Sequence, residues 1–459
     1  MKRIYLILIA AVAITFASCS DQDMDAVKPD TGQGAPIIDL PEGATQGKIL
    51  VKFKPEAASF LDAATTRSGI SDMDAVLQRI GISELERIFP VDSRTEERTR
   101  KAGLNLWYII HFAEDTDLEQ VAKDLSQVAD VAKVQFTRAI QRSYDPNVRA
   151  TVFTKQAMTR VVHTTRAVNT DANDPFFNLQ WGCKNDGSIL QNGEKNDKGD
   201  NVVPAVMGVD VNCGEAWKLC TGNPSIVVAV LDEGVMYDHP DLEGNIWVNE
   251  DETFASKEDA DGNGYAGDRY GYNFTDDKGY ISYDDPNDTG HGTHVAGIIS
   301  AVRNNGEGIS GIAGGDKANN RGGVKIMSCQ VFSGSKGCDL YQEAKAVKYA
   351  ADNGAVILQC SWGYNSGLSN PISGYTPGFT SDKDWVDAAP LEKEAFDYFL
   401  HNAGSPNDVI DGGIIVFAAG NEYAAMAGYP GAYPDYISVA ALAADGTPSC
   451  YSHYAMGVS

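Results

Sequence analysis

The sequence is short of several features that mark particular classes of protein. It has 37 basic residues against 63 acidic ones, a formal net charge of −26, whereas a nucleic-acid partner requires clustered lysine and arginine. None of its eight cysteines stands in a C-x-x-C pair, which disfavours a structural zinc site. After the N-terminus no apolar run is long enough to cross a bilayer. These absences argue against a nucleic-acid partner and against an integral membrane protein.

The composition is that of a globular protein. The chain has 459 residues, of which 43% are hydrophobic. This length allows two or three domains, and a core of that size does not depend on disulfides. Cys329 and Cys360 lie within apolar strand patterns, so we predict that both are buried thiols.

The N-terminus has the pattern of an export signal. Two basic residues are followed by an apolar run and then by small residues that end at Cys19. Small residues before a cysteine resemble a bacterial lipoprotein signal, which implies that residues 1–18 are removed and that Cys19 carries a lipid. An ordinary secretory signal, with Cys19 incidental, is the alternative. We therefore expect an exported protein, either a lipoprotein of the outer membrane or cell envelope, tethered only through its lipid, or a secreted protein.

The next three segments differ in character. Residues 19–44 are polar and rich in glycine and proline, as is typical of a flexible tether. Over 45–140 the patterns follow the order β-α-β-β-α-β, which predicts a ferredoxin-like α+β domain. Its strands are expected at 47–54, 85–91, 105–112 and 132–138, and its helices at 73–80 and 117–128. Asp117 opens the second helix with a favourable carboxylate. Residues 141–170 lose this periodicity, and we interpret them as a cleavable linker.

Residues 171–459 alternate between strands and helices. Continuous apolar strands are expected at 225–232, 325–332, 355–362, 414–421 and 436–442, with helices at 293–302, 340–351 and 394–400. Such strands are typical of a parallel sheet that is buried on both faces. The fold class is therefore α/β with a doubly wound, mainly parallel sheet, preceded by the α+β domain. A sheet of this kind places its ligand site at the carboxyl ends of its strands.

Polar residues stand at those ends. Asp232 closes the first strand, and His291 opens an apolar helix within D-T-G-H-G-T-H-V. An imidazole exposed at a helix start suits a catalytic base that a carboxylate orients. Taken alone, Asp232 is equally explained as a helix cap or a loop carboxylate. Zinc binding by His291 and His294 is a rival, but the H-E-x-x-H spacing is absent.

Two more strand ends carry motifs. Asn421 follows a strand in F-A-A-G-N-E, and Ser361, Trp362 and Gly363 follow another in L-Q-C-S-W-G. An asparagine amide can stabilise a developing oxyanion.

Together the four segments resemble the subtilisin-like serine proteases, the subtilases. The matching pieces are V-V-A-V-L-D-E-G, G-H-G-T-H-V-A-G, C-S-W-G and A-A-G-N-E, within residues 171–459. The resemblance implies a serine endopeptidase that hydrolyses peptide bonds of polypeptide substrates. It makes His291 the general base, Asp232 its orienting acid and Asn421 the oxyanion group. It also implies that Ser361, Trp362 and Gly363 pair with the substrate backbone and line the S1 pocket, which the large Trp362 would narrow or reshape.

The nucleophile departs from the family pattern. Subtilases carry it in a G-T-S-x-A-x-P motif after the oxyanion asparagine, and the sequence, which ends at Ser459, has no such motif. We therefore expect a chain truncated before the catalytic serine, inactive as printed and active in its full-length form. The alternatives are a catalytically inactive subtilase-fold binding protein and a calcium-stabilised surface adhesin.

The resemblance extends to the first domain. An α+β module before a subtilase resembles the family's propeptide, which implies a zymogen whose own propeptide acts as inhibitor and folding chaperone. An unrelated binding module of the same common fold is the alternative.

Calcium is the cofactor that the resemblance implies, in a structural role. The first expected site takes side-chain oxygens from Asp174, Asp241 and Asn305 and main-chain carbonyls from Arg303, Glu307 and Ile309. Separately, D-A-D-G-N-G-Y matches the opening half of an EF-hand-type loop, with Asp259, Asp261 and Asn263 as ligands. A solvated acidic loop is the alternative for this second site.

Overall fold

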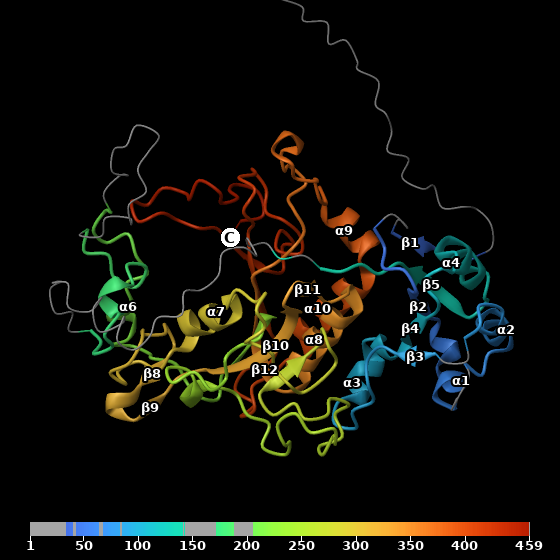
Figure 1. Ribbon diagram of the computed structural model, residues 1–459, viewed down its shortest axis with the longest axis horizontal. Helices are drawn as coiled ribbons and strands as arrows, with labels where there is room; N and C mark the ends of the chain where they lie inside the picture. Colours follow the sequence, from blue (N-terminus) through green and yellow to red (C-terminus); the bar gives the residue numbers. More distant parts are fainter. Residues whose placement is uncertain are drawn as a thin grey trace, which may run out of the picture.

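The computed structural model describes residues 34–39, 43–63, 68–82, 85–140, 142, 171–187 and 205–458. Figure 1 shows a smaller N-terminal domain, blue to teal, beside a larger α/β domain. The signal, Cys19 and all but residue 142 of the expected linker 141–170 lie outside the described residues. Among the helices that are described, none combines the length and apolar character needed to cross a membrane.

The N-terminal domain is built on a five-stranded sheet in the order β1-β5-β2-β4-β3. Its strands are β1 (Ile37–Ile38), β2 (Lys48–Phe53), β3 (Glu86–Arg87), β4 (Trp107–His111) and β5 (Val131–Gln135). The four predicted strands are present, although β3 is short. β1 lies in the segment expected to be a tether, and it pairs in parallel with β5. β2 runs antiparallel to both β4 and β5.

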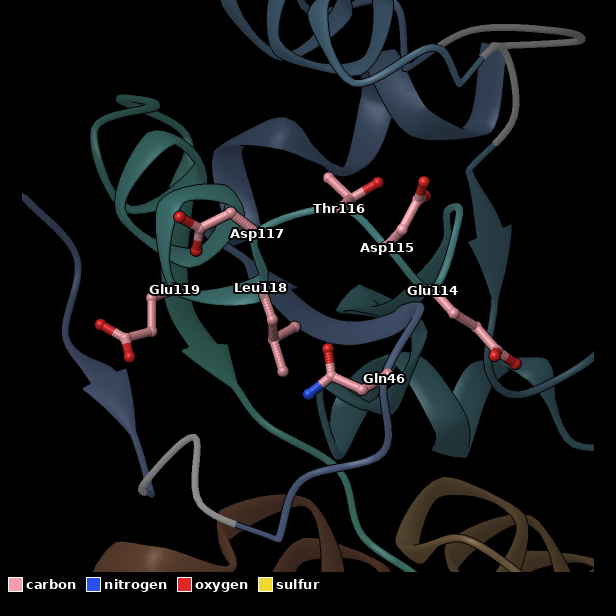
Figure 2. A pocket seen from close by; sticks show the side chains of 7 residues that line it. All are labelled: Gln46, Glu114, Asp115, Thr116, Asp117, Leu118 and Glu119. Carbon is pink, nitrogen blue, oxygen red and sulfur yellow. The ribbon is translucent and has the colours of Figure 1, made fainter.

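In the described part of the N-terminal domain, four α-helices accompany this sheet. They are α1 (Ala58–Ala63), α2 (Ser71–Arg79), α3 (Glu96–Lys101) and α4 (Leu118–Ser126). The two predicted helices are α2 and α4, and Asp117 caps α4 by accepting a 3.0 Å hydrogen bond from Gln120 N. An open hollow of about 390 Å³ lies at this cap. Figure 2 shows the side chains that line it, those of Gln46 and residues 114–119. Its other carboxylates are exposed to solvent.

The strand period of two gives the N-terminal sheet two buried faces. Ile49, Val51 and Phe53 of β2 point towards α2 and α4 and join the core of the N-terminal domain. Leu50 points the other way and joins the core of the larger domain. Lys52 shares this second face with Leu50, and its Nζ lies 2.7 Å from Glu394. The sheet therefore docks on the larger domain through the face that α2 and α4 leave open.

The larger domain is built on a seven-stranded sheet in the order β11-β10-β6-β12-β13-β14, with β7 also paired to β10. Its strands are β6 (Val227–Glu233), β7 (Gly271–Asn273), β10 (Lys325–Ser333), β11 (Lys336–Gly337), β12 (Ala355–Cys360), β13 (Ile414–Ala418) and β14 (Ile437–Val439). Only β11 is antiparallel to its neighbour. All five predicted strands are present. A separate hairpin joins β8 (Gly315–Asp316) to β9 (Arg321–Gly322).

Helices cover both faces of this sheet, as the doubly wound prediction requires. The helices at these faces are α7 (His291–Ser300), α8 (Leu340–Asp352), α9 (Asp382–Ala388) and α10 (Pro390–Asn402), whereas α6 (Cys213–Ala216) packs in a separate cluster with Phe177. Ala229 and Leu231 of β6 belong to the core that includes α8 and α10. The alternating residues Val228 and Val230 belong to the core that includes Ala296 of α7. The predicted fold class is confirmed, and Cys329 and Cys360 are buried thiols as predicted.

The N-terminal domain rests on α8 and α10 (Figure 1) through carboxylates of those helices. Asp339, the N-cap residue of α8, accepts hydrogen bonds from Thr45 Oγ1 (2.9 Å) and Lys48 Nζ (2.7 Å). Glu394 of α10 accepts from Lys52 and from Trp107 Nε1 (2.8 Å). These acids fix the position of the sheet, because misplacing it would leave partly buried charges without partners.

Replacing Glu394 tests this docking. In Glu394→Ala, Lys52 and Trp107 lose a shared acceptor, so we expect the opening free energy of the interface to fall by about 1–3 kcal/mol. Hydrogen–deuterium exchange of β2 and β4 measures this. The control is Asp397→Ala, which removes the partner of Lys393 on the same helix. Equal exchange in the two variants would mean that Glu394 does not hold the domains together.

Two buried glutamates face each other where α8 meets α10. Glu343 and Glu392 are 0% and 1% exposed. Burial raises the pKa of Glu392 to about 8 against hydrogen bonds that lower it, including a 2.6 Å bond from Trp385 Nε1. Burial and the neighbouring Glu392 also raise the pKa of Glu343. Both carboxyl groups are therefore more easily protonated in the folded chain than in the unfolded one.

The sign of the resulting pH dependence follows directly. The folded pKa values exceed the unfolded ones, so the contribution to stability is complete below about pH 4.5 and is lost as the pH rises through about 8. We expect the free energy of unfolding to decline over this range by a few kcal/mol, and Glu392→Gln to flatten the decline. Urea unfolding as a function of pH is the measurement. The exposed control is Asp387→Asn. If the unfolding free energy of Glu392→Gln declined with pH as steeply as that of this control, Glu392 would not be the group responsible.

Candidate active site

Three neighbouring parallel strands end at the same edge of the larger sheet. Cys360, the last residue of β12, pairs with Leu231 of β6 on one side and with Phe417 of β13 on the other. This register places Asp232, the segment from Ser361 and the turn before Asn421 at that edge. The carboxyl ends of the strands thus bring the motifs together, as the sequence predicted.

Asp232 and His291 form a direct pair. Nδ1 of His291 lies 2.9 Å from each carboxylate oxygen of Asp232. The Asp232 side chain is 0% exposed, whereas that of His291 is 27% exposed. Burial raises the pKa of Asp232, and the hydrogen bond with His291 opposes that rise. An ionised Asp232 favours the tautomer with the proton on Nδ1, in which Nε2 carries the lone pair that a base requires.

Glu233 holds the start of the His291 helix. Its Oε2 accepts hydrogen bonds from Thr289 N (2.9 Å), Thr289 Oγ1 (3.0 Å) and His291 N (3.0 Å). The carboxylate therefore satisfies N–H groups that a helix start leaves without partners. Gly292 permits this approach, because a Cβ there would lie 2.2 Å from Glu233 O. Glu233 is a positioning residue whose capping role the sequence analysis missed, although it stands next to Asp232.

Residues 361–363, which follow β12, bury their largest side chain and use their main chain for pairing at the sheet edge. Trp362 is 2% exposed, and its Nε1 donates a 3.1 Å hydrogen bond to Leu231 O. The side chain of Trp362 is therefore turned into the core, and its effect on the S1 pocket stays a prediction. Its main chain pairs antiparallel with Arg142. Ser361 Oγ accepts from Gln359 Nε2 (2.8 Å), and a Cβ on Gly363 would lie 2.9 Å from Tyr429 O.

Asn421 is exposed in the turn that follows β13. A buried pair supports this turn, with Glu422 Oε2 2.6 Å from Nε2 of His453. Burial alone would raise the pKa of Glu422, but hydrogen bonds led by that of His453 lower it below its usual range. A Cβ on Gly420 would lie 2.2 Å from Cε1 of His453, so the ring packs directly under the turn. The sequence analysis missed Glu422 and His453 because 31 residues separate them.

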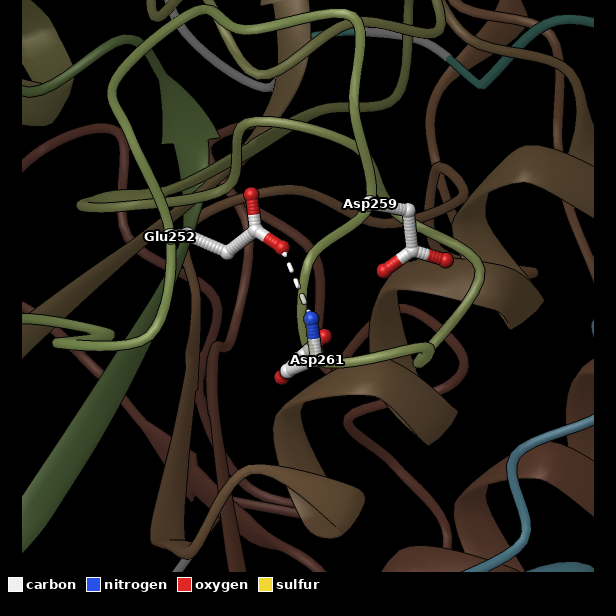
Figure 3. A group of neighbouring side chains, drawn as sticks. All are labelled: Glu252, Asp259 and Asp261. Atoms are coloured by element: carbon white, nitrogen blue, oxygen red, sulfur yellow. Dashed lines mark hydrogen bonds between the residues drawn. The ribbon is translucent and has the colours of Figure 1, made fainter.

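An acidic group lies in the insertion between β6 and α7. Figure 3 shows Glu252, Asp259 and Asp261, whose ligand atoms lie within 4.8 Å of one another. Burial raises the pKa of Asp261, although Arg94 of the N-terminal domain, 3.4 Å away, opposes this. Asn263 is adjacent, but its Oδ1 accepts from Tyr265 N. The structure thus joins Asp259 and Asp261 of the expected second site to Glu252, which precedes the D-x-D-x-N pattern.

The first expected calcium site gathers around the loop 303–310. The Asp174 carboxylate accepts from Asn304 N and Asn305 N, and Asp241 accepts from Asn305 Nδ2 (2.8 Å) and Ile309 N (2.9 Å). Burial raises the pKa of Asp241 to about 6, and the charge of Asp174 adds to this rise. Two carboxylates thus meet the same loop, and both accept hydrogen bonds from its N–H groups.

Arg303 and Glu307, the other two residues of the expected first calcium site, also lie in the loop 303–310. The main-chain carbonyl of Arg303 accepts a hydrogen bond from Lys317 N (3.0 Å). The Arg303 side chain points away from the two carboxylates, with Nη2 3.0 Å from Asp316. The loop therefore brings the expected ligands into one neighbourhood, with the Arg303 carbonyl already engaged by an N–H group.

Several known proteases are similar to this chain. Halolysin from Haloferax mediterranei is 30% identical over 244 residues, which are 53% of this chain and 36% of that protein. The halolysin-like extracellular serine protease Nep from Natrialba magadii is 28% identical over 243 residues, 53% of this chain and 34% of that protein. The thermophilic serine proteinase of Bacillus sp. strain AK1 is 27% identical over 362 residues, 73% of this chain and 77% of that protein.

The extent of these matches differs. The chain spans about a third of the length of halolysin and of Nep, and about three quarters of the Bacillus proteinase. Among solved structures, fervidolysin from Fervidobacterium pennivorans aligns with 89% of this chain and 45% of its own, at 20% identity and a TM-score of 0.47.

Family models match both domains. The model for the N-terminal domain of the subtilase family matches residues 49–187, which include β3 to β5 and all of β2 but its first residue. The model for the subtilase family itself matches residues 223–458, more than half of the chain, and this range contains Asp232, His291 and Asn421. The chain therefore belongs to the subtilase family of subtilisin-like serine proteases.

Proposed function

We propose that the complete protein is an exported serine endopeptidase, made as a zymogen, that hydrolyses peptide bonds in polypeptides. The observation that carries this proposal is the 2.9 Å contact between the buried Asp232 and the partly exposed His291. It lies near the end of β12, where the main chain of Trp362 pairs antiparallel with that of Arg142. A base and a peptide-binding edge are thus next to each other.

The proposed mechanism assigns one role to each residue. His291 Nε2 takes the proton of a serine hydroxyl as its oxygen attacks the peptide carbonyl, and later returns it to the leaving amine. Asp232 stabilises the imidazolium that forms in between. The Asn421 amide and a main-chain N–H stabilise the oxyanion. The main chain at 361–363 holds the substrate in an extended conformation.

The zymogen proposal rests on the path of the chain that leaves the N-terminal domain. Ile140 N donates a 2.9 Å hydrogen bond to Cys338 O, and bridges join Ala139 to Asp339 and Arg142 to Trp362. This segment lies along the edge where a substrate backbone would pair. We propose that the N-terminal domain inhibits its own enzyme in this way until the linker at 141–170 is cut.

The proposal of export rests on the N-terminal signal pattern ending at Cys19. The similarity to Nep, which is described as extracellular, supports it. Attachment to the outer membrane through a lipid on Cys19 is the form that we favour, and a secreted form is the alternative.

Asp232→Asn tests the catalytic proposal. The amide would hold the wrong imidazole tautomer without changing the shape of the site, so kcat is expected to fall by about 10³–10⁴-fold while KM changes little. Hydrolysis of a fluorogenic peptide by the complete gene product measures this.

Labelling by a fluorophosphonate gives a second readout. We expect wild type to be labelled and His291→Ala not to be, whereas Asp276→Asn, an acidic change away from the pair, should be labelled like wild type. A wild-type protein that neither hydrolyses peptides nor takes the label would contradict the proposal and would favour a binding protein on a subtilase scaffold.

We also propose that Ca²⁺ stabilises the larger domain. Asp174 and Asp241, with the Asn305 amide and main-chain oxygens of the loop 303–310, would hold one ion, and Glu252, Asp259 and Asp261 would hold another. The supporting observation is the raised pKa of Asp241, about 6, which reflects a carboxylate that burial and a neighbouring charge destabilise. A bound cation would remove that cost.

Removal of calcium should therefore lower thermal stability. At calcium concentrations about 100 times Kd, chelation is expected to lower the melting temperature by about 5–10 °C. Differential scanning fluorimetry with calcium and with a chelator measures the shift. Asp241→Asn should reduce the shift from the first site and Asp261→Asn that from the second, with Asp276→Asn as control. The same melting temperature with and without calcium would contradict both sites.

A further inference from the structure

Arg142 lies at the sheet edge that carries the Asp232–His291 pair. Its main chain pairs antiparallel with Trp362, in the place proposed for a substrate backbone. Its side chain is only 10% exposed, and Nη1 lies 2.9 Å from Oε1 of Glu233. Glu233 is the same residue whose Oε2 accepts the N–H of His291. The guanidinium thus contacts the residue that directly follows Asp232 in the sequence.

Four groups contact the guanidinium of Arg142: two carboxylates, a main-chain carbonyl and an aromatic ring. The Glu233 side chain is 1% exposed, and the Asp288 side chain, 3% exposed, lies 3.9 Å from Nη2. The carbonyl of Gly334 accepts a hydrogen bond from Nη2. The ring of Phe332 faces the guanidinium carbon at 5.4 Å from the ring centre. Charge, a main-chain acceptor and an aromatic face therefore meet around one planar cation.

Without such a cation the two carboxylates would keep only uncharged donors within the described part of the chain, namely Thr289 and His291 N for Glu233 and Gly334 N (2.7 Å) for Asp288. Among the described residues, Arg142 is the one basic side chain within ion-pair distance of Glu233 or Asp288. Oδ2 of Asp288 is buried and has no hydrogen-bond partner among the described residues. Burial, with smaller contributions from Glu233 and Asp285, raises the pKa of Asp288 to about 6, whereas the hydrogen bond from Gly334 N and the charge of Arg142 oppose that rise. Loss of Arg142 from this edge would leave two buried acids side by side, which is costly.

We propose that Glu233, Asp288, Phe332 and the Gly334 carbonyl form an arginine-selective substrate subsite, and that the enzyme cleaves polypeptides carrying arginine at the position equivalent to Arg142. This inference rests on the proposed function, because it treats the segment at Arg142 as occupying the path of a substrate. Arginine fits better than lysine, since its planar group can bond Glu233 and Gly334 at once while lying against Phe332. Arg142 then fills the subsite in the zymogen as a substrate residue would.

Peptide hydrolysis by the matured complete protein tests the subsite. Each of the four positions before the cleaved bond is given arginine or citrulline, a neutral side chain of the same shape. We expect kcat/KM to fall by about 30-fold or more when arginine becomes citrulline at one of these positions. Equal rates for arginine and citrulline at every position would overturn the subsite while leaving the proposed protease intact.

Variants separate recognition from positioning. Glu233→Gln should bring the arginine-to-citrulline ratio close to one, and Asp288→Asn should reduce it several-fold. The matched control, Asp276→Asn, removes an acid that binds Lys278 rather than Arg142 and should keep the wild-type ratio. If Glu233→Gln slows both peptides equally, Glu233 only positions His291 and the subsite assignment is wrong.

A binding measurement keeps the inference testable in a protein without hydrolysis. Arg142→Gln frees the subsite of its own arginine in the full chain. Fluorescence anisotropy then compares labelled A-I-Q-R, the sequence of residues 139–142, with the same peptide ending in citrulline. At least tenfold tighter binding of the arginine peptide is expected, and equal affinities would overturn the subsite. If the protein binds the arginine peptide more tightly but hydrolyses no peptide, the proposed protease activity is wrong and the subsite stands.

Discussion

The contact between Asp232 and His291 is the interaction on which the rest of the larger domain depends. A carboxylate that is 0% exposed is costly unless it is hydrogen-bonded. The cost is offset only if the helix that starts at His291 meets the end of β6 at close range. Gly292 permits that approach, and Glu233 bonds the N–H groups at the start of the helix. One buried acid thus dictates a strand end, a glycine and a helix start.

The same edge serves two purposes through Glu233. One carboxylate oxygen holds His291 N, and the other binds the guanidinium of Arg142. Positioning of the base and recognition of a basic residue are therefore linked at a single side chain. The main chain at Trp362 completes this arrangement, because its indole is turned into the core and leaves the backbone open for pairing.

The N-terminal domain reaches this edge because its sheet is buried on both faces. Ile49 and Val51 pack beneath its own helices, whereas Leu50 joins the core of the larger domain. Docking on α8 and α10 through Asp339 and Glu394 directs the chain after β5 along residues 338–339 and towards Trp362. The docking position of the N-terminal domain thus determines that the chain after β5 pairs with Trp362.

The sequence by itself determined the elements and the edge at which they act. Local periodicity records which side of a strand or helix is buried, so β6, β12, β13 and α7 were predictable, and parallel strands place their motifs at one edge. Tertiary structure alone decided the contacts between distant residues. The helix α3 lacks an apolar period, and its Arg98 lies 2.9 Å from Asp352 of α8. Glu422 meets His453, and Arg142 meets Glu233, only because strand register and domain docking bring them together. No local pattern encodes such distances, since they depend on how whole elements pack.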